Sequence, residues 1–133
     1  MATFTRTIRG IDPEQEVVVF ASRLPLRRRR DAPGFLVDTV HIKKHLDGLI
    51  ADPDEGLLWY ALRADLLTNV YWTTSAWRDD EALRAFVISE PHRTIMRDRR
   101  GTLGSFDTAR WTVPGAELPV AHQRTIERIE VRD

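Results

Sequence analysis

The sequence predicts an α+β domain in which helices pack against a four-stranded antiparallel sheet and one further helix follows at the C-terminal end. Three observations support this fold class. Apolar or β-branched residues form four segments of strand length, at 17–26, 57–65, 70–77 and 103–113. Two other segments, 35–50 and the stretch that begins at Asp79, carry apolar residues at helical spacing. The link 66–69 is short enough to make the two middle strands an antiparallel hairpin.

The composition is typical of one small domain. The chain has 133 residues, of which 42% are hydrophobic, and it contains no cysteine, which excludes disulfides and thiolate chemistry. Twenty basic residues balance twenty acidic ones, so the charge does not favour nucleic acid as a partner. No apolar run has the length of a bilayer span or the form of a signal peptide. We therefore expect a cytoplasmic protein with no membrane or nucleic-acid partner, built as a tail or edge strand at 1–15 and one domain at 16–133.

The first strand of the domain runs from Val17 to Leu26 and ends at four consecutive arginines, Arg27 to Arg30. Guanidinium groups at a strand end could clamp a phosphate or another anion. The alternative is a solvated loop whose charges repel one another. No glycine-rich phosphate motif accompanies the run, which favours the solvated loop.

The first helix is predicted at 35–50. Asp38, His41 and His45 lie beside its apolar stripe, at spacings of three and four residues. Two imidazoles and a carboxylate on neighbouring turns can ligate one metal ion. The alternative is an exposed polar face with the histidines partly covering the sheet. No recognisable metal signature is present, so we predict no metal site.

The hairpin carries aromatic side chains on both of its faces. Alternation places Trp59 and Arg63 on one face of its first strand. On its second strand, Trp72 lies on the face opposite to Tyr71 and Trp77. Burying a large apolar side chain is worth roughly 1.5–3 kcal/mol, so neither face should be left in water. We expect helices to cover one face, and a partner subunit or a pocket to cover the other.

The second helix begins at Asp79, a favourable N-cap, and is interrupted at Pro91, which cannot continue it. Ser89 is then the predicted cap of a short third helix, and His92 falls in the first turn of that helix. The positive end of a helix lowers the pKa of an imidazole and favours its neutral form, which can accept a proton or bind a ligand. The alternative is a packing histidine that is satisfied by a local hydrogen bond.

The element order strand, helix, hairpin, helix, strand is that of the ferredoxin-like βαββαβ fold. Pro114 and Gly115 end the last strand, and a helix at 118–130 packs across the domain or onto a neighbour. Such domains can pair their sheets face to face in a closed homodimeric barrel. The aromatic residues on both faces agree with a homodimer.

Several segments carry a family resemblance. The main ones are the run 71–77 (YWTTSAW), the helix start that follows it and the sequence SEPH at 89–92; residues 20–24, 63–65 and Trp111 extend the pattern over about 16–125. Together they resemble the dimeric α/β-barrel superfamily of antibiotic-biosynthesis monooxygenases and spheroidene-monooxygenase-like proteins. The resemblance implies that fold. It implies no single reaction, because the superfamily includes cofactor-independent oxygenases, haem-degrading enzymes, isomerases and cyclases.

The haem-degrading branch of this superfamily is the poorer match. Phe86 stands where that branch has a ring-distorting tryptophan, and Met96 stands where it has the haem-ligating histidine. His92, one turn earlier, matches the histidine that commonly closes this helix in the broader monooxygenase-like group. The resemblance therefore favours no cofactor, with haem as the alternative.

These observations favour a monooxygenase-like tailoring enzyme that oxidises an aromatic or polyene substrate without a cofactor. An electron-rich substrate anion can reduce oxygen unaided, so the site needs a base and an apolar pocket. His92 is the candidate base, and Arg63 the candidate stabiliser of an enolate or phenolate. The candidate pocket walls are aromatic side chains: Trp59, Trp72, Trp77, Tyr71 and Phe86.

Two other functions stay open. The same pocket could hold haem or another small hydrophobic molecule without turnover. Alternatively, the aromatic residues could serve only a dimer core in a protein that acts through its interactions. Complete filling of the space between sheet and helices by side chains would favour this last function, because no room for a ligand would remain.

Overall fold

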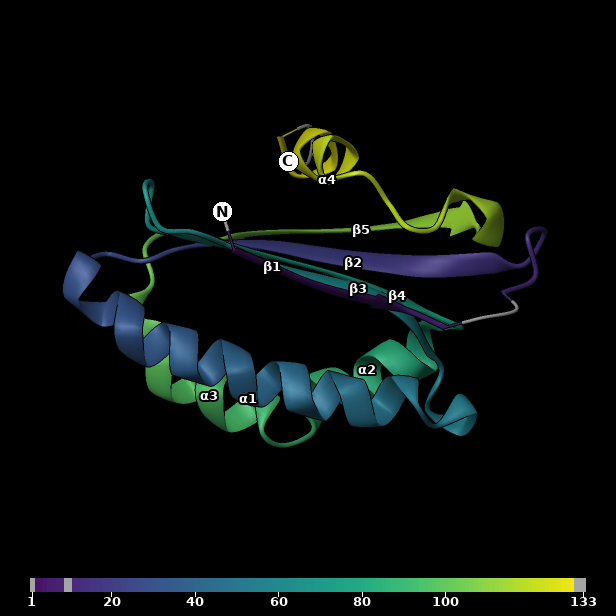
Figure 1. Ribbon diagram of the computed structural model, residues 1–133, viewed down its shortest axis with the longest axis horizontal. Coiled ribbons are helices and arrows are strands. Elements are labelled where there is room, and N and C mark those ends of the chain that lie inside the picture. The colour runs from purple at the N-terminus through teal and green to yellow at the C-terminus, as the bar shows by residue number, and fades with distance from the viewer. Residues whose placement is uncertain (1, 9–10, 131–133) are drawn as a thin grey trace.

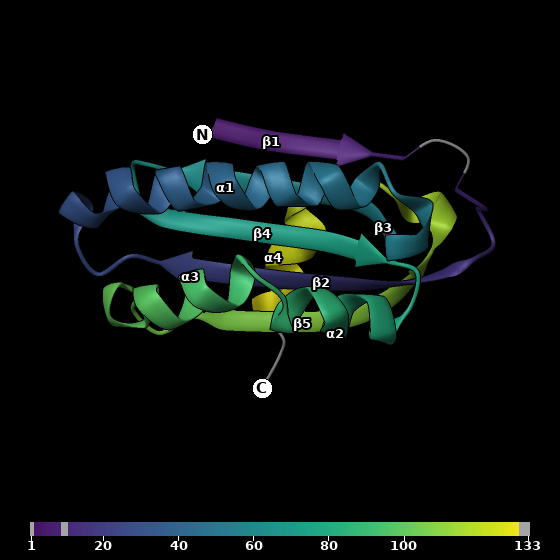
Figure 2. The ribbon, with the colours of Figure 1, turned by 90° about the horizontal axis from the view of Figure 1, so that it is seen from below.

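One antiparallel sheet organises the chain. The computed structural model describes residues 2–8 and 11–130. Its strands are β1 (Ala2–Thr7), β2 (Glu16–Pro25), β3 (Leu57–Asp65), β4 (Val70–Trp77) and β5 (Asp107–Pro114). Its helices are α1 (Ala32–Ile50), α2 (Asp80–Ile88), α3 (His92–Arg99) and α4 (His122–Glu130). The strands lie in the order β1-β3-β4-β2-β5, and every neighbouring pair is antiparallel (Figure 2).

The helices lie on both faces of this sheet. Helices α1, α2 and α3 cover one face, and α4 lies across the other (Figure 1). The four strands β5-β2-β4-β3 with α1 and α2 have the ferredoxin-like arrangement, so the predicted α+β fold class is confirmed. The sheet has one strand more than the predicted four, because β1 pairs with β3 along its whole length. None of the described helices combines the length and the apolar character needed to cross a bilayer.

The core between the sheet and α1 and α2 is built on β3 and β4. Tyr60, Leu62 and Trp77 pack there with Leu46 of α1 and Leu83 of α2. Helix α2 begins as the sequence predicts, since the Asp79 carboxylate accepts a hydrogen bond from the Ala82 backbone N at 2.9 Å. Such a cap satisfies one of the free N–H groups in the first turn of the helix.

A second core lies on the other face of the sheet, beneath α4. Trp59 and Trp111 are 2% and 6% exposed, and they pack with Val19 and with Val120 and Ile129 from the C-terminal segment. Arg128 of α4 also lies over the Trp111 ring, with its guanidinium carbon 5.6 Å from the ring centroid. This face was expected to meet a partner subunit or a pocket, and that expectation is corrected, because α4 of the same chain packs on it. The aromatic residues of this face need no partner subunit to leave water.

The four arginines after β2 partly bind the backbone of neighbouring segments. Arg27 Nε donates to the Leu103 carbonyl at 2.6 Å. The two terminal nitrogens of Arg29 donate to the carbonyls of Leu66 and Leu67 in the β3–β4 turn, at 2.9 and 2.6 Å. The run is exposed, as the solvated-loop alternative requires. Two of its members also tie loops together.

The Asp47 carboxylate gives the first testable prediction. Tyr60 donates to it at 2.5 Å and Lys43 at 2.7 Å. Burial acts to raise the pKa of Asp47, but the hydrogen bonds from Lys43, Tyr60 and Arg6 outweigh burial and hold the pKa below its ordinary value. The ionised carboxylate therefore adds stability above about pH 4, and this stability is lost as the pH falls through the lowered folded-state pKa.

We expect Asp47→Asn to lower the free energy of unfolding by about 1–2 kcal/mol at neutral pH, because charge-assisted hydrogen bonds are lost. The gap between wild type and variant should begin to shrink below about pH 4, where the unfolded chain takes up a proton, and should close as the pH falls through the lowered pKa of the folded carboxylate. Urea unfolding at several pH values measures both effects. The matched control is Asp98→Asn, whose pair with Arg97 is more than half exposed on both sides and should contribute little. A gap that does not depend on pH would contradict this account.

Candidate functional site

A pocket of about 310 Å³ lies between the sheet and the helices α1, α2 and α3. Its volume lies within the usual range for small-molecule sites. Val87 and Phe106 line it and are 38% and 47% exposed, so they mark its opening to solvent. The space between sheet and helices is therefore not filled by side chains, which argues against a domain whose aromatic residues serve only packing.

The walls of the pocket are mostly apolar. The aliphatic and aromatic lining residues are Phe20, Leu24, Phe35, Ile42, Leu46, Leu62, Phe86, Val87, Ile95, Met96 and Phe106. A short series of hydroxyl groups crosses the sheet side, from Ser22 of β2, Thr73 and Ser75 of β4 and Thr108 of β5. Ser22 and Thr73 share a hydrogen bond, and Ser75 Oγ accepts from Trp77 Nε1 at 2.8 Å. The sheet thus offers hydroxyl groups to an oxygen-bearing ligand within an otherwise apolar pocket.

An ion pair joins α1 to α3 beside the pocket. Asp38 of α1 accepts from Arg99 Nε of α3 at 2.5 Å, and the two side chains are only 15% and 31% exposed. Asp38 lines the pocket, but its charge is balanced by Arg99. Because Asp38 is paired and His41 is exposed, Asp38, His41 and His45 do not form a metal centre. No group of three or more candidate metal ligands exists in the described part of the chain.

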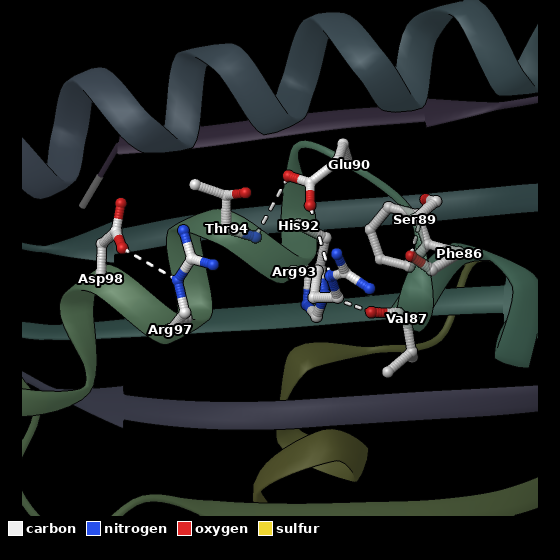
Figure 3. A network of polar contacts seen from close by, with 9 residues as sticks. All are labelled: Phe86, Val87, Ser89, Glu90, His92, Arg93, Thr94, Arg97 and Asp98. Atoms are coloured by element: carbon white, nitrogen blue, oxygen red, sulfur yellow. Dashed lines mark hydrogen bonds and ion pairs between the residues drawn. The ribbon is translucent and has the colours of Figure 1, made fainter.

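His92 lines the pocket. Its ring lies beside Val87 (Figure 3). Its Nδ1 lies 3.1 Å from the Val87 carbonyl oxygen, which can only accept a hydrogen bond. Nδ1 therefore carries the proton, and Nε2 of the neutral ring keeps a free lone pair. Burial lowers the pKa of His92 below its ordinary value, the bond to Val87 partly opposes this effect, and His45 lowers the pKa further.

The Phe86 ring lies beside both histidines. Its centroid is 4.9 Å from that of His92 and 5.9 Å from that of His45. Phe86 lines the pocket and also a smaller cavity of about 190 Å³, whose lining includes His45 and Trp77. It therefore forms the wall between the two spaces and fixes one side of the His92 ring.

The break between α2 and α3 lies where the sequence predicts it, but the cap of α3 differs from the predicted one. Glu90 Oε2 accepts from the Thr94 backbone N at 3.3 Å, so Glu90 and not Ser89 caps the first turn of α3 (Figure 3). Ser89 Oγ donates back to the Phe86 carbonyl at 2.9 Å and closes the end of α2. The prediction that Ser89 caps α3 is wrong, because its hydroxyl is hydrogen-bonded to the last turn of α2 instead.

Three predicted site residues lie on the sheet face that carries α4, away from the pocket. Trp59 belongs to the core beneath α4, and Trp72 meets His122 of α4 with ring centroids 5.1 Å apart. Arg63 shares their face by alternation and lies in register with Trp72. The expectation that these residues line the same pocket as His92 is therefore corrected. Alternation correctly assigns the side chains of β3 and β4 to two opposite faces, but it does not say which face lines the pocket.

Of the other predicted wall residues, one lines the pocket and two do not. Phe86 lines the pocket. Tyr71 and Trp77 face the helices but do not line it. The Tyr71 hydroxyl donates to the Ala32 carbonyl at 3.2 Å, and Trp77 borders the smaller cavity. The sequence did not predict the hydroxyl groups of the pocket, which come from Ser22, Thr73, Ser75 and Thr108.

A haem fits this pocket poorly. The free Nε2 of His92 could serve as an axial ligand. However, no lysine or arginine belongs to the described pocket lining, so the two propionates of a haem would lack cationic partners. Arg99 is nearby but is bound to Asp38.

The chain was compared with known proteins. No family model and no curated protein matches it. A candidate monooxygenase from Lactobacillus acidophilus NCFM is 16% identical and superimposes with a TM-score of 0.58, over 84% of this chain and 51% of its own. The chain thus spans about half the length of that protein.

Two further solved structures are covered almost completely by this chain. A dimeric ferredoxin-like protein of unknown function from Thermobifida fusca YX is 13% identical, with a TM-score of 0.60 over 81% of this chain and 99% of its own. SnoaB, a cofactor-independent oxygenase from Streptomyces nogalater, is 15% identical, with a TM-score of 0.50 over 73% and 92% of the two chains. At these identities the likeness shows the fold alone. This fold agrees with the ferredoxin-like arrangement expected from the sequence.

Proposed function

From a fold shared with monooxygenase-like proteins, we propose that this chain oxidises a small electron-rich aromatic or polyene molecule without a cofactor. The observation that carries the proposal is the position of His92 in the lining of an apolar pocket of about 310 Å³, with its Nδ1 at the Val87 carbonyl oxygen. Such a pocket excludes water from a bound molecule, and such an imidazole can take a proton from it.

The reaction begins with proton transfer from a substrate hydroxyl to His92 Nε2. The resulting phenolate gives one electron to molecular oxygen, and the two radicals combine to form a peroxide on the ring. The peroxide takes the proton back from His92 and loses water, with the ring hydrogen as the second proton, which leaves a quinone. One oxygen atom enters the product and the other enters water, and the substrate supplies all four electrons, so no external reductant is needed.

The hydroxyl groups of the sheet would hold the substrate oxygen. They would stabilise the phenolate, the role that the sequence predicted for Arg63. These groups belong to Ser22, Thr73, Ser75 and Thr108. A hydroxyl can donate to a phenolate oxygen, and hydrogen bonds to a charged acceptor are stronger than those between neutral groups. This proposed arrangement favours a substrate that is apolar overall and has an oxygen function at one edge.

The test is oxygen uptake by purified protein with a panel of phenols and hydroquinones. We expect uptake above buffer for some members, and we expect Thr39→Phe to lower it at least tenfold by filling the pocket from α1. The control is Val40→Phe on the same helix, at a 37% exposed position that does not line the pocket. No uptake with any member of the panel, or equal loss in both variants, would contradict the proposal.

Non-catalytic binding of a small hydrophobic molecule is the second candidate function, because the same apolar pocket could hold such a molecule without turnover. Haem fits the pocket poorly, so hemin would support this candidate only if it gave a Soret band that disappears in His92→Ala. A ligand that binds without oxygen uptake would likewise favour a binding protein.

We also propose a homodimer in the cytoplasm. The Thermobifida fusca protein is described as dimeric, and the absence of cysteine suits a reducing compartment. Because α4 lies on the sheet face that a barrel would pair, a dimer through that face would contact α4 as well as the strands.

A further inference from the structure

One end of the molecule combines an exposed apolar turn with a surplus of arginines, and we propose that this end binds the surface of an anionic lipid bilayer. The turn links β3 to β4. Its Leu67 is 86% exposed, the largest value among the described large hydrophobic side chains, and Leu66 is 49% exposed. Two neighbouring leucines in water are costly, which indicates a surface that is covered in use. This inference does not depend on the proposed function.

The arginines and the turn are held together directly. Arg29, in the 3-10 turn before α1, donates to the carbonyls of both Leu66 and Leu67. Both segments lie at the same end of the molecule in the two ribbon views (Figures 1 and 2). Asp65 Oδ1 also accepts from the backbone N of Leu67 and of Thr68, at 3.2 and 3.3 Å. The leucines are therefore carried by an ordered turn that is fixed to the arginine run.

Positive charge is concentrated around this turn. Arg27 N donates to the Thr102 carbonyl at 2.8 Å, which places Arg100, two residues before Thr102, beside the same run. The exposed arginines at this end are Arg27, Arg28, Arg29, Arg30 and Arg100. Within the described residues, no ion pair joins any of these five to an acidic group. The acidic residues of the run and the turn are Asp31 and Asp65, so the arginines outnumber them. The chain as a whole has no formal net charge, so this surplus is local.

An anionic bilayer matches both features of this surface. Its headgroups attract arginines, and the boundary between headgroups and acyl chains accepts short apolar side chains. Nucleic acid offers phosphates but no apolar layer for Leu66 and Leu67. The sequence led us to expect no membrane partner because no segment is long enough to span one, but surface binding needs no such segment.

The test is pelleting of the protein with lipid vesicles at low ionic strength. We expect binding to vesicles with equal parts of phosphatidylcholine and phosphatidylglycerol, and little binding to phosphatidylcholine alone. Arg28→Ser combined with Arg30→Ser should lower the partition coefficient about fivefold for each arginine removed. Leu67→Ser should lower it about tenfold.

Matched controls use exposed residues on other elements. Arg84→Ser combined with Arg124→Ser removes two exposed arginines from α2 and α4, and Ile88→Ser removes a 64% exposed aliphatic side chain. These controls should bind as wild type does, and circular dichroism checks the fold of every variant. No binding to anionic vesicles, equal loss in the controls, or unchanged binding of Leu67→Ser would each overturn the proposal. Unchanged binding of Leu67→Ser would mean that the arginines bind polyanions in general, without insertion of the turn into a bilayer.

Discussion

Replacing His92 by alanine is expected to lower the rate of oxygen uptake about 10²–10⁴-fold, the usual contribution of a general base. His92 lines the pocket, and no other histidine lines it in the described part of the chain. The ring is half-buried near the opening, so the protein should keep its fold. Steady-state kinetics with the best member of the phenol panel measure the loss, which should fall mainly on kcat.

The pH profile separates a base from a packing residue. Burial lowers the pKa of His92, so the imidazole should remain neutral to below its ordinary value of about 6.5. Activity should therefore persist through neutral pH and fall only on the acid side of that value. The control is His41→Ala, an exposed histidine of α1 outside the pocket lining, which should leave the rate and the profile unchanged. Full activity of His92→Ala at neutral pH would remove His92 from the mechanism.

Replacing Trp59 by alanine is expected to lower the free energy of unfolding by about 3–5 kcal/mol. Trp59 is 2% exposed and packs beneath the C-terminal segment that carries α4. Its indole Nε1 is buried with no hydrogen-bond partner among the described residues. Trp59→Phe should therefore lose much less stability, because it removes the unpaired N–H and keeps most of the ring.

Urea unfolding of the Trp59 variants is the measurement, and Trp72→Ala is the comparison. Trp72 lies on the same face of the sheet but is only partly buried, so its loss should cost less. Activity per folded molecule should not change in Trp59→Phe, since Trp59 lies on the sheet face away from the pocket. Equal destabilisation by all three substitutions would contradict a core formed beneath α4.

Local pattern predicted the elements of this fold well. The strands at Leu57–Asp65 and Val70–Trp77 match the predicted bounds, and Asp79 caps α2 as expected. Each of these features depends on neighbouring residues: a period of two, a short polar turn or a capping carboxylate. The choice of face for the C-terminal helix depends on contacts between distant parts of the chain. Periodicity gives α4 an apolar stripe but does not say which surface that stripe meets.

The candidate site was predicted only in part for the same reason. His92 and Phe86 line the pocket. They could be predicted because the helix break after α2 is a local feature of the sequence. Trp59 and Trp72 were assigned to it because aromatic residues suggest a pocket wall, yet large rings more often fill a core. The hydroxyl groups of Thr73 and Ser75 were overlooked because alone each is typical of an ordinary strand. Only the register of β2, β4 and β5 brings them together with Thr108.

The protonation state of His92 tests the central claim most directly, and nitrogen-15 NMR of the histidine rings measures it. We expect the His92 ring at neutral pH to be neutral with its proton on Nδ1, to titrate below about 6.5, and to shift when a phenol enters the pocket. A His92 ring that titrates at or above the ordinary value and does not respond to any phenol would contradict the account.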